Sequence, residues 1–150
     1  MKRTSHSLII ALVASFLLSC SASRNATLST IGLVPLADYT ITNNAVKDTV
    51  YRVVRNDADF DALVRATSAN AKRPGFDGQM VVALFTEAPS SLQFVQAGFM
   101  GKNVQVYLAS CNAAQPCSTG KVFLATIPKV GSAKRIQFFI NNETKATVEL

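Results

Sequence analysis

The sequence has 150 residues, 49% of them hydrophobic, with a formal net charge of +6 and a single histidine, His6. That length allows one domain that buries about two-thirds of its unfolded surface, and it excludes a second domain of ordinary size. Because the cations are spread along the chain without a long block, we interpret the mild positive charge as solubility and proximity to anionic polymers or lipid headgroups.

The first residues have the layout of a secretory signal. Lys2 and Arg3 precede an apolar run over residues 8–18, which is followed by the small residue Ser19. The run is 11 residues long, whereas a membrane-spanning helix needs about 20. We therefore expect it to direct export and not to remain as a membrane span.

The end of this signal, Leu17-Leu18-Ser19-Cys20, resembles the lipobox of bacterial lipoproteins. The resemblance implies that the signal peptide 1–19 is removed and that the sulfur of Cys20 carries a glycerolipid, with palmitate-type acyl chains holding the protein on a membrane of the cell envelope. Ser21 stands where Asp would mark inner-membrane retention, which favours the outer membrane if two membranes are present. The alternative is an ordinary signal peptide cut near Ala22, which would discard Cys20.

Export in this form also removes His6 and leaves a domain without histidine. That absence excludes Ser-His-Asp and Cys-His catalytic systems and imidazole-ligated zinc or copper sites. We therefore expect no catalytic residues, no metal and no cofactor, and export makes nucleic acid a poor partner. The alternative is a histidine-independent serine hydrolase, for which the sequence offers Ser90 and Ser91 near Glu87, or Ser118 with Lys121.

The two remaining cysteines, Cys111 and Cys117, form an even pair in an oxidising compartment. The residues between them favour turns, so we expect a structural disulfide that closes the connection between two strands. The alternative is a redox pair, but redox-active cysteines are usually spaced Cys-x-x-Cys beside a helix N-terminus.

From Cys20 onward, residues 20–31 are mostly polar and contain no aromatic residue, so we expect a flexible tether. One globular domain is then expected over 32–150. Residues 33–41 predict a short strand that Pro35 confines to a sheet edge. Residues 48–54 are β-branched and aromatic, and they predict a second strand.

Residues 56–69 predict one amphipathic helix, capped by Asn56 or Asp57. Apolar or small residues recur on one face at Phe60, Leu63, Val64 and Thr67. The acidic triplet at positions 57, 59 and 61 also resembles the opening of an EF-hand calcium loop. The sixth and twelfth loop positions are Ala62 and Ser68 instead of Gly and Glu, so helix capping is favoured.

A loop over 68–79 leads to the unbroken apolar run 80–85, which is typical of a central strand buried on both faces. A turn at residues 89–91 is expected to separate this run from a strand over 92–99. That strand should form a hairpin with residues 104–108.

Further strands are predicted over 121–127, 135–140 and 146–150. Strands at this spacing with short turns indicate the α+β class, as a mostly antiparallel, sandwich-like β domain with one helix.

Residues 47–141 also resemble the PrcB-type C-terminal domain, named after an accessory lipoprotein of a bacterial surface protease complex. The resemblance rests on Asp59-Phe60-x-x-Leu63-Val64, Pro74-Gly75-Phe76-Asp77, the run 80–85 and the late stretch 122–129. The sequence departs from the family at 90–93, Ser-Ser-Leu-Gln, where the family has Gly-Gly-Tyr. The resemblance implies a non-catalytic, partner-binding domain.

Together these patterns predict a lipid-anchored binding or accessory module of the cell envelope without catalytic activity. Its expected contacts are the membrane, through lipid on Cys20, and an envelope protein or polymer. Besides the serine hydrolase, the alternative is a structural envelope lipoprotein that acts through its mild positive charge. The sequence does not locate a binding surface, because Phe99, Tyr107, Phe123 and Phe139 occupy ambiguous strand positions.

Overall fold

The computed structural model describes residues 27–42, 47–117 and 119–150, so the signal peptide and Cys20 lie outside the described residues. Within these ranges the fold is mostly β-sheet with one short helix, which confirms the predicted α+β class. In chain order the elements are β1 (Ser29–Ile31), β2 (Val34–Leu36), β3 (Tyr39–Ile41), β4 (Val50–Val54), α2 (Asp57–Leu63), β5 (Val64–Ala66), β6 (Gln79–Met100), β7 (Asn103–Ser110), β8 (Thr119–Pro128), β9 (Arg135–Ile140) and β10 (Glu143–Glu149).

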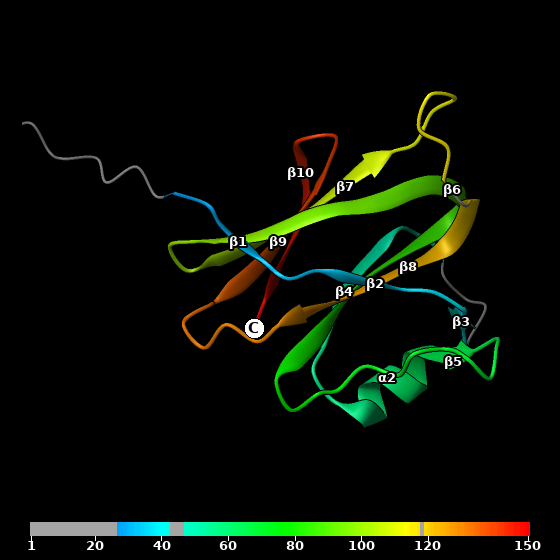
Figure 1. Ribbon diagram of the computed structural model, residues 1–150, viewed down its shortest axis with the longest axis horizontal. Coiled ribbons are helices and arrows are strands. Elements are labelled where there is room, and N and C mark those ends of the chain that lie inside the picture. Colours follow the sequence, from blue (N-terminus) through cyan, green and yellow to red (C-terminus); the bar gives the residue numbers. More distant parts are fainter. Residues whose placement is uncertain (1–26, 43–46, 118) are drawn as a thin grey trace, which may run out of the picture.

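Strand β6 organises the molecule, because its two halves belong to two different layers (Figure 1). Its first half lies between β4 and β8, and β2 pairs with the far side of β8. Its second half lies between β1 and β7, and β9 and β10 continue that layer. The pairings of this sheet are antiparallel except that of β7 with β9, which is parallel. A separate two-stranded sheet joins β3 to β5.

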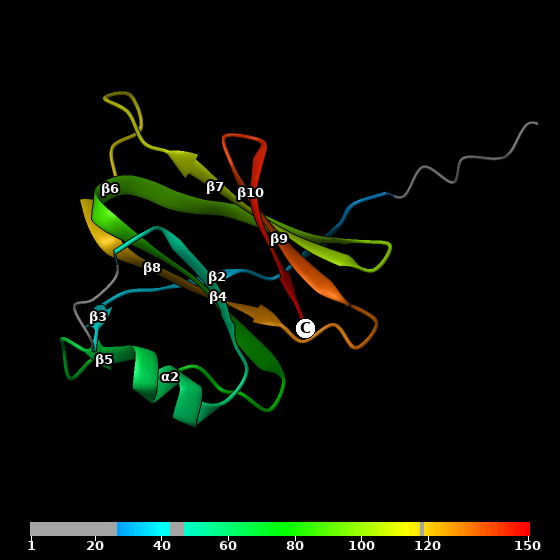
Figure 2. The same cartoon turned by 180° about the vertical axis from the view of Figure 1, so that it is seen from behind.

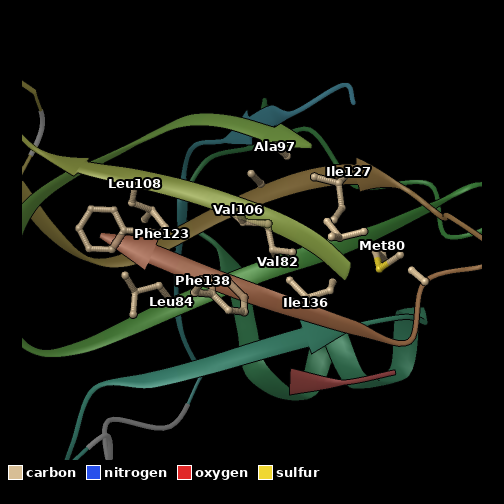
Figure 3. Packing of buried hydrophobic residues seen from close by; sticks show 13 residues of the cluster. Met80, Val82, Leu84, Ala97, Val106, Leu108, Phe123, Ile127, Ile136 and Phe138 are labelled. Atoms are coloured by element: carbon tan, nitrogen blue, oxygen red, sulfur yellow. The ribbon is translucent and has the colours of Figure 1, made fainter. Parts of the chain in front are cut away.

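The first half of β6 is buried on both faces, as its apolar run predicted. Even-numbered residues from 80 to 84 enter the main core between the two layers, and Figure 3 shows them in one cluster with Val106, Ile136 and Phe138. Odd-numbered residues from 81 to 85 enter a second cluster with Phe60 of α2. Seen from behind, α2 and β5 lie together at the end of the molecule away from β9 and β10 (Figure 2). The helix therefore covers the outer face of the layer that contains β4, β6 and β8.

The predicted hairpin is confirmed by the antiparallel pairing of β6 with β7. Its turn contains Gly101 at φ 65°, a backbone conformation that L-residues rarely adopt. Val104, Val106 and Leu108 are all buried on the side that was predicted for them. The sequence also predicted strands at the positions of β4, β8, β9 and β10.

The helix prediction over 56–69 was wrong in length, because α2 ends at Leu63. Asn56 caps it as expected, with its side-chain oxygen accepting from the backbone N–H of Asp59 at 2.8 Å. Val64 already has extended backbone angles, and Val64–Ala66 pairs with Tyr39–Ile41. Strand pairing with a distant segment thus replaces the last turns that the apolar period suggested.

The turn predicted at residues 89–91 was also wrong, since β6 runs continuously through it. Ser90 and Ser91 pair with Gly120 and Thr119, as the strand requires. Pro89 lies where the ladder between β6 and β8 shifts register, between Phe85 and Ser90. Proline has no N–H to donate, and at this bulge no ladder bond is lost.

Residues 29–31 were predicted as part of the flexible tether 20–31, but they form β1 and pair with Ala97 to Phe99. Ile31 packs against the main core, and this apolar contact stabilises the strand. The predicted strand over 33–41 is divided into β2 and β3 by Asp38, which has φ 66°. Strand β2 lies at the edge of its layer, as Pro35 predicted.

Candidate functional site

The serines proposed for hydrolysis are engaged with other groups. The Ser91 and Thr119 hydroxyl oxygens lie 2.7 Å apart in a hydrogen bond, and the Ser90 hydroxyl donates to the Ala88 carbonyl at 3.3 Å. Among the described residues, neither serine hydrogen-bonds to a lysine or a carboxylate that would act as its base. Ser118 lies outside the described residues, so its relation to Lys121 stays a prediction.

The acidic triplet of α2 is occupied by capping and by an ion pair. Arg73 donates to Asp57 at 2.9 Å and to Asp61 at 2.8 Å, and its guanidinium carbon lies 5.9 Å from the centre of the Phe60 ring. Asp59 accepts from the Asn56 side chain at 2.8 Å. In the part of the chain that the structure describes, no group of three His, Cys, Asp or Glu side chains could hold a metal ion.

The hydrogen bonds of this ion pair shift the pKa values of Asp61 and Arg73. Hydrogen bonds from Arg73 hold the pKa of Asp61 below its usual value. The same two carboxylates, Asp61 first and then Asp57, raise the pKa of Arg73 above its already high ordinary value. Asp61 and Arg73 therefore both carry full charge at neutral pH. Their ion pair fastens the loop after β5 to helix α2.

Cys111 and Cys117 lie at disulfide distance, as predicted, with their sulfurs 1.93 Å and their Cα atoms 5.9 Å apart. They close the connection between β7 and β8. Within the loop, the Asn112 side-chain oxygen accepts from the backbone N–H groups of Ala114 at 2.9 Å and Gln115 at 3.0 Å. The closed loop is joined to β6, because the Cys111 N–H donates to the Ser91 carbonyl at 2.9 Å.

A groove of about 570 Å³ lies beside this loop. Its walls are residues 35–39 from the end of β2 to the start of β3, residues 92–94 of β6, Cys117, and residues 119, 120 and 122–124 of β8. That volume falls in the range of ligand-binding pockets, about 300–1,000 Å³. The lining combines apolar side chains with a few polar ones, among them Asp38 and Gln93.

One wall of the groove is an unpaired stretch of strand edge. On one side β6 pairs with β7 from Leu92 to Met100. On the other side, β8 pairs with β6 as far as Ser91 and β1 pairs with it from Ala97. Among the described residues, 92–96 have no strand partner on that side. Such an edge offers backbone donors and acceptors to an extended peptide.

The groove and the start of β1 lie at opposite ends of the second half of β6. The register of β1, with Ser29 opposite Phe99, brings the chain in beside the β6–β7 turn. The groove begins at Phe94, six residues along the strand from Met100, which corresponds to about 20 Å. Figure 1 shows the same arrangement, with the start of β1 and the β6–β7 turn toward the left and the bend of β6 at the right.

Tyr39 forms part of the groove wall and is held in place by its hydroxyl, which donates to the Lys72 carbonyl at 3.0 Å. Burial raises the pKa of Tyr39, so the side chain remains neutral. Its ring packs edge-on against Phe60, with centroids 5.2 Å apart. The second hydrophobic cluster thus positions the β3 side of the groove.

The four aromatic residues that the sequence left ambiguous do not form the groove as a group. Phe123 lies in the main core and also borders the groove, and Phe99 packs against that core. Tyr107 and Phe139 stack on the outer face of the sheet, with ring centroids 4.7 Å apart. The sequence did not predict the groove, because the groove arises where β8 and β1 pair with separate parts of β6 and leave a gap between them.

A comparison with models of known protein families finds no match, and comparisons with curated proteins and with solved structures find none either. The lipobox and PrcB-type resemblances therefore stay predictions. Within the described residues, no helix has the length and hydropathy needed to cross a membrane.

Proposed function

We propose that this protein is a lipid-anchored, non-catalytic binding module of the cell envelope, with the outer membrane favoured where there are two membranes. Cys20 carries the lipid, and the groove beside residues 92–94 receives an envelope protein. The observation that carries the proposal is the separation of the groove, with its unpaired strand edge, from the end of β6 beside which β1 begins. A membrane anchor at one end leaves the groove accessible at the other.

Two further observations support this function over its alternatives. The Ser91 hydroxyl bonds to Thr119 and not to a basic side chain, which favours binding over serine hydrolysis. An unpaired strand edge suits an extended peptide better than a charged polymer, because main-chain hydrogen bonds supply part of the affinity. A protein partner is therefore favoured over an envelope polymer.

Site-specific photo-crosslinking in cells tests the proposal. A photoreactive amino acid is placed at Gln93 in the groove, and at the exposed Thr147 on β10 as the matched control. We expect position 93 to yield a discrete crosslinked protein that saturates as expression rises, and position 147 to yield none.

Equal crosslinking from both positions would contradict a groove-specific partner. Loss of the crosslink at high salt would indicate a polymer held by charge. Specific labelling of Ser91 by a serine-reactive probe would indicate a hydrolase instead.

A further inference from the structure

Three exposed cations gather at the end of the molecule where β1 begins. Lys102 lies in the turn between β6 and β7, and Lys134 and Arg135 lie at the start of β9. The backbone N–H of Lys134 donates to the Lys102 carbonyl at 2.8 Å, and Arg135 pairs with Asn103 in the parallel β7–β9 ladder. Within the described residues, none of the three makes an ion pair. We call these three residues the basic end.

The charges around the basic end offset it only in part. Glu149 lies opposite Arg135 in the β9–β10 ladder but beyond ion-pair distance. The backbone N–H of Leu150 donates to the Lys134 carbonyl at 2.9 Å. Nearby, Lys129 donates through its side chain to the Phe76 carbonyl. The tether itself contributes Arg24 and, over 20–31, no acidic residue. By contrast, Asp57, Asp59 and Asp61 lie on α2 at another end of the molecule.

The lipid and the basic end are close along the chain. Pairing in β1 brings Leu28 beside the β6–β7 turn that contains Lys102. Six residues, 21–26, separate Cys20 from the first described residue, Thr27. Even fully extended, the chain from Cys20 to Thr27 spans at most about 25 Å. The tether therefore holds this end of the domain within reach of the membrane surface.

We propose that the basic end docks on anionic lipid headgroups next to the anchor and fixes the orientation of the domain, with the groove directed away from the membrane. This inference rests on the proposed lipid anchor at Cys20. A cation near an anionic membrane surface contributes about fivefold to association. If Glu149 cancels one of the three cations, the two that remain give a total bias of roughly 25-fold. The lipid already confines the domain to the membrane surface, so the attraction of the basic end does not have to supply the membrane affinity. It has only to favour one orientation of the domain over the others.

Headgroup quenching of the mature, lipidated protein in vesicles tests the inference. A fluorescent amino acid at the exposed Ser132, in the β8–β9 connection, reports proximity to a quencher on the lipid headgroups. We expect stronger quenching in vesicles of phosphatidylglycerol with phosphatidylcholine than in phosphatidylcholine alone, and we expect high salt to remove the difference.

A triple variant, Lys102→Gln, Lys134→Gln and Arg135→Gln, should lose this difference. The control triple, Arg65→Gln, Lys72→Gln and Lys121→Gln, removes equal charge from exposed positions in and around β5 and at the start of β8, and it should keep the difference. Unfolding curves that match the wild type establish that both variants are folded.

The outcomes separate the orientation from the anchor. Protein that floats with both vesicle types but is quenched equally in them would contradict the proposed orientation and not the lipid anchor. A basic-end triple variant that is quenched like the wild type would contradict the orientation in the same way. Protein that does not float with phosphatidylcholine vesicles contradicts the lipid anchor, and the orientation with it.

Discussion

At the scale of single residues, the contact between Gly98 and Leu28 determines how the N-terminal segment is held. A Cβ atom built on Gly98 would lie 2.5 Å from one Leu28 methyl carbon and 2.6 Å from its branching carbon. The leucine side chain therefore occupies space that only glycine leaves free. This contact lies beside the strand pairing that joins β1 to β6.

Gly98→Ala should displace Leu28 and destabilise the fold by about 1–3 kcal/mol, the usual cost of overpacking. Denaturant unfolding measures the loss, and hydrogen exchange should increase in β1. Gly120→Ala is the matched control, because its Cβ would meet nothing closer than 4.0 Å. Adding Leu28→Ala to the Gly98 variant should restore exchange protection in β1, and unaltered stability of Gly98→Ala alone would refute the close contact.

A second residue-scale prediction concerns the ion pair of Arg73. Because its hydrogen bonds lower the pKa of Asp61 in the folded protein, the carboxylate contributes stability above the pKa of the unfolded chain, about 4. That contribution is lost as the pH falls through the lower, folded pKa. Arg73→Gln should raise the pKa of Asp61 toward its ordinary value, as followed by NMR titration.

Glu143 supplies the internal control for this titration. Lys145 lowers its pKa through a hydrogen bond on β10, independently of Arg73. The Arg73 variant should leave the Glu143 titration unchanged. An Asp61 titration that does not move in the variant would rule out Arg73 as the cause of its lowered pKa.

At the scale of elements, the disulfide loop connects β7 to β8 next to the groove. Cross-linking Cys111 to Cys117 closes a short loop, for which chain entropy gives a stabilisation of about 2 kcal/mol. The double variant Cys111→Ser and Cys117→Ser should lose about that amount in denaturant unfolding. Thiol titration of the unreduced mature protein should find both cysteines unreactive, and two reactive thiols would contradict a structural disulfide.

The elements also show how far the sequence determines the fold. The unbroken run 80–85 predicted a doubly buried strand correctly, because burial on both faces requires apolar side chains at every position. The hairpin at Gly101 was equally predictable from local turn chemistry. These features depend on residues close together in the chain.

The errors all involve pairing between distant segments. Residues 64–66 follow the helical period of α2 yet pair with β3. Ser90 and Ser91 have turn-like composition yet pair with β8. The groove depends on the register of β1 and β8 along one strand, and it left no local signal in the sequence.

At the scale of the whole molecule, the two ends of the second half of β6 have different surroundings. The start of β1, the β6–β7 turn and Lys102 lie at one end. The groove and the disulfide loop lie at the other. This polarity suits a domain that is held at a membrane and presents a binding surface away from it.

That account depends on the modification of Cys20, which the mass of the mature protein tests most directly. The protein is extracted from the membranes of the native cell with detergent, and its intact mass and N-terminal peptide are measured by mass spectrometry. We predict a chain that begins at Cys20 and carries a glyceryl group with two or three acyl chains. A chain that still begins at Met1, or a trimmed N-terminus without acyl mass, would contradict the account.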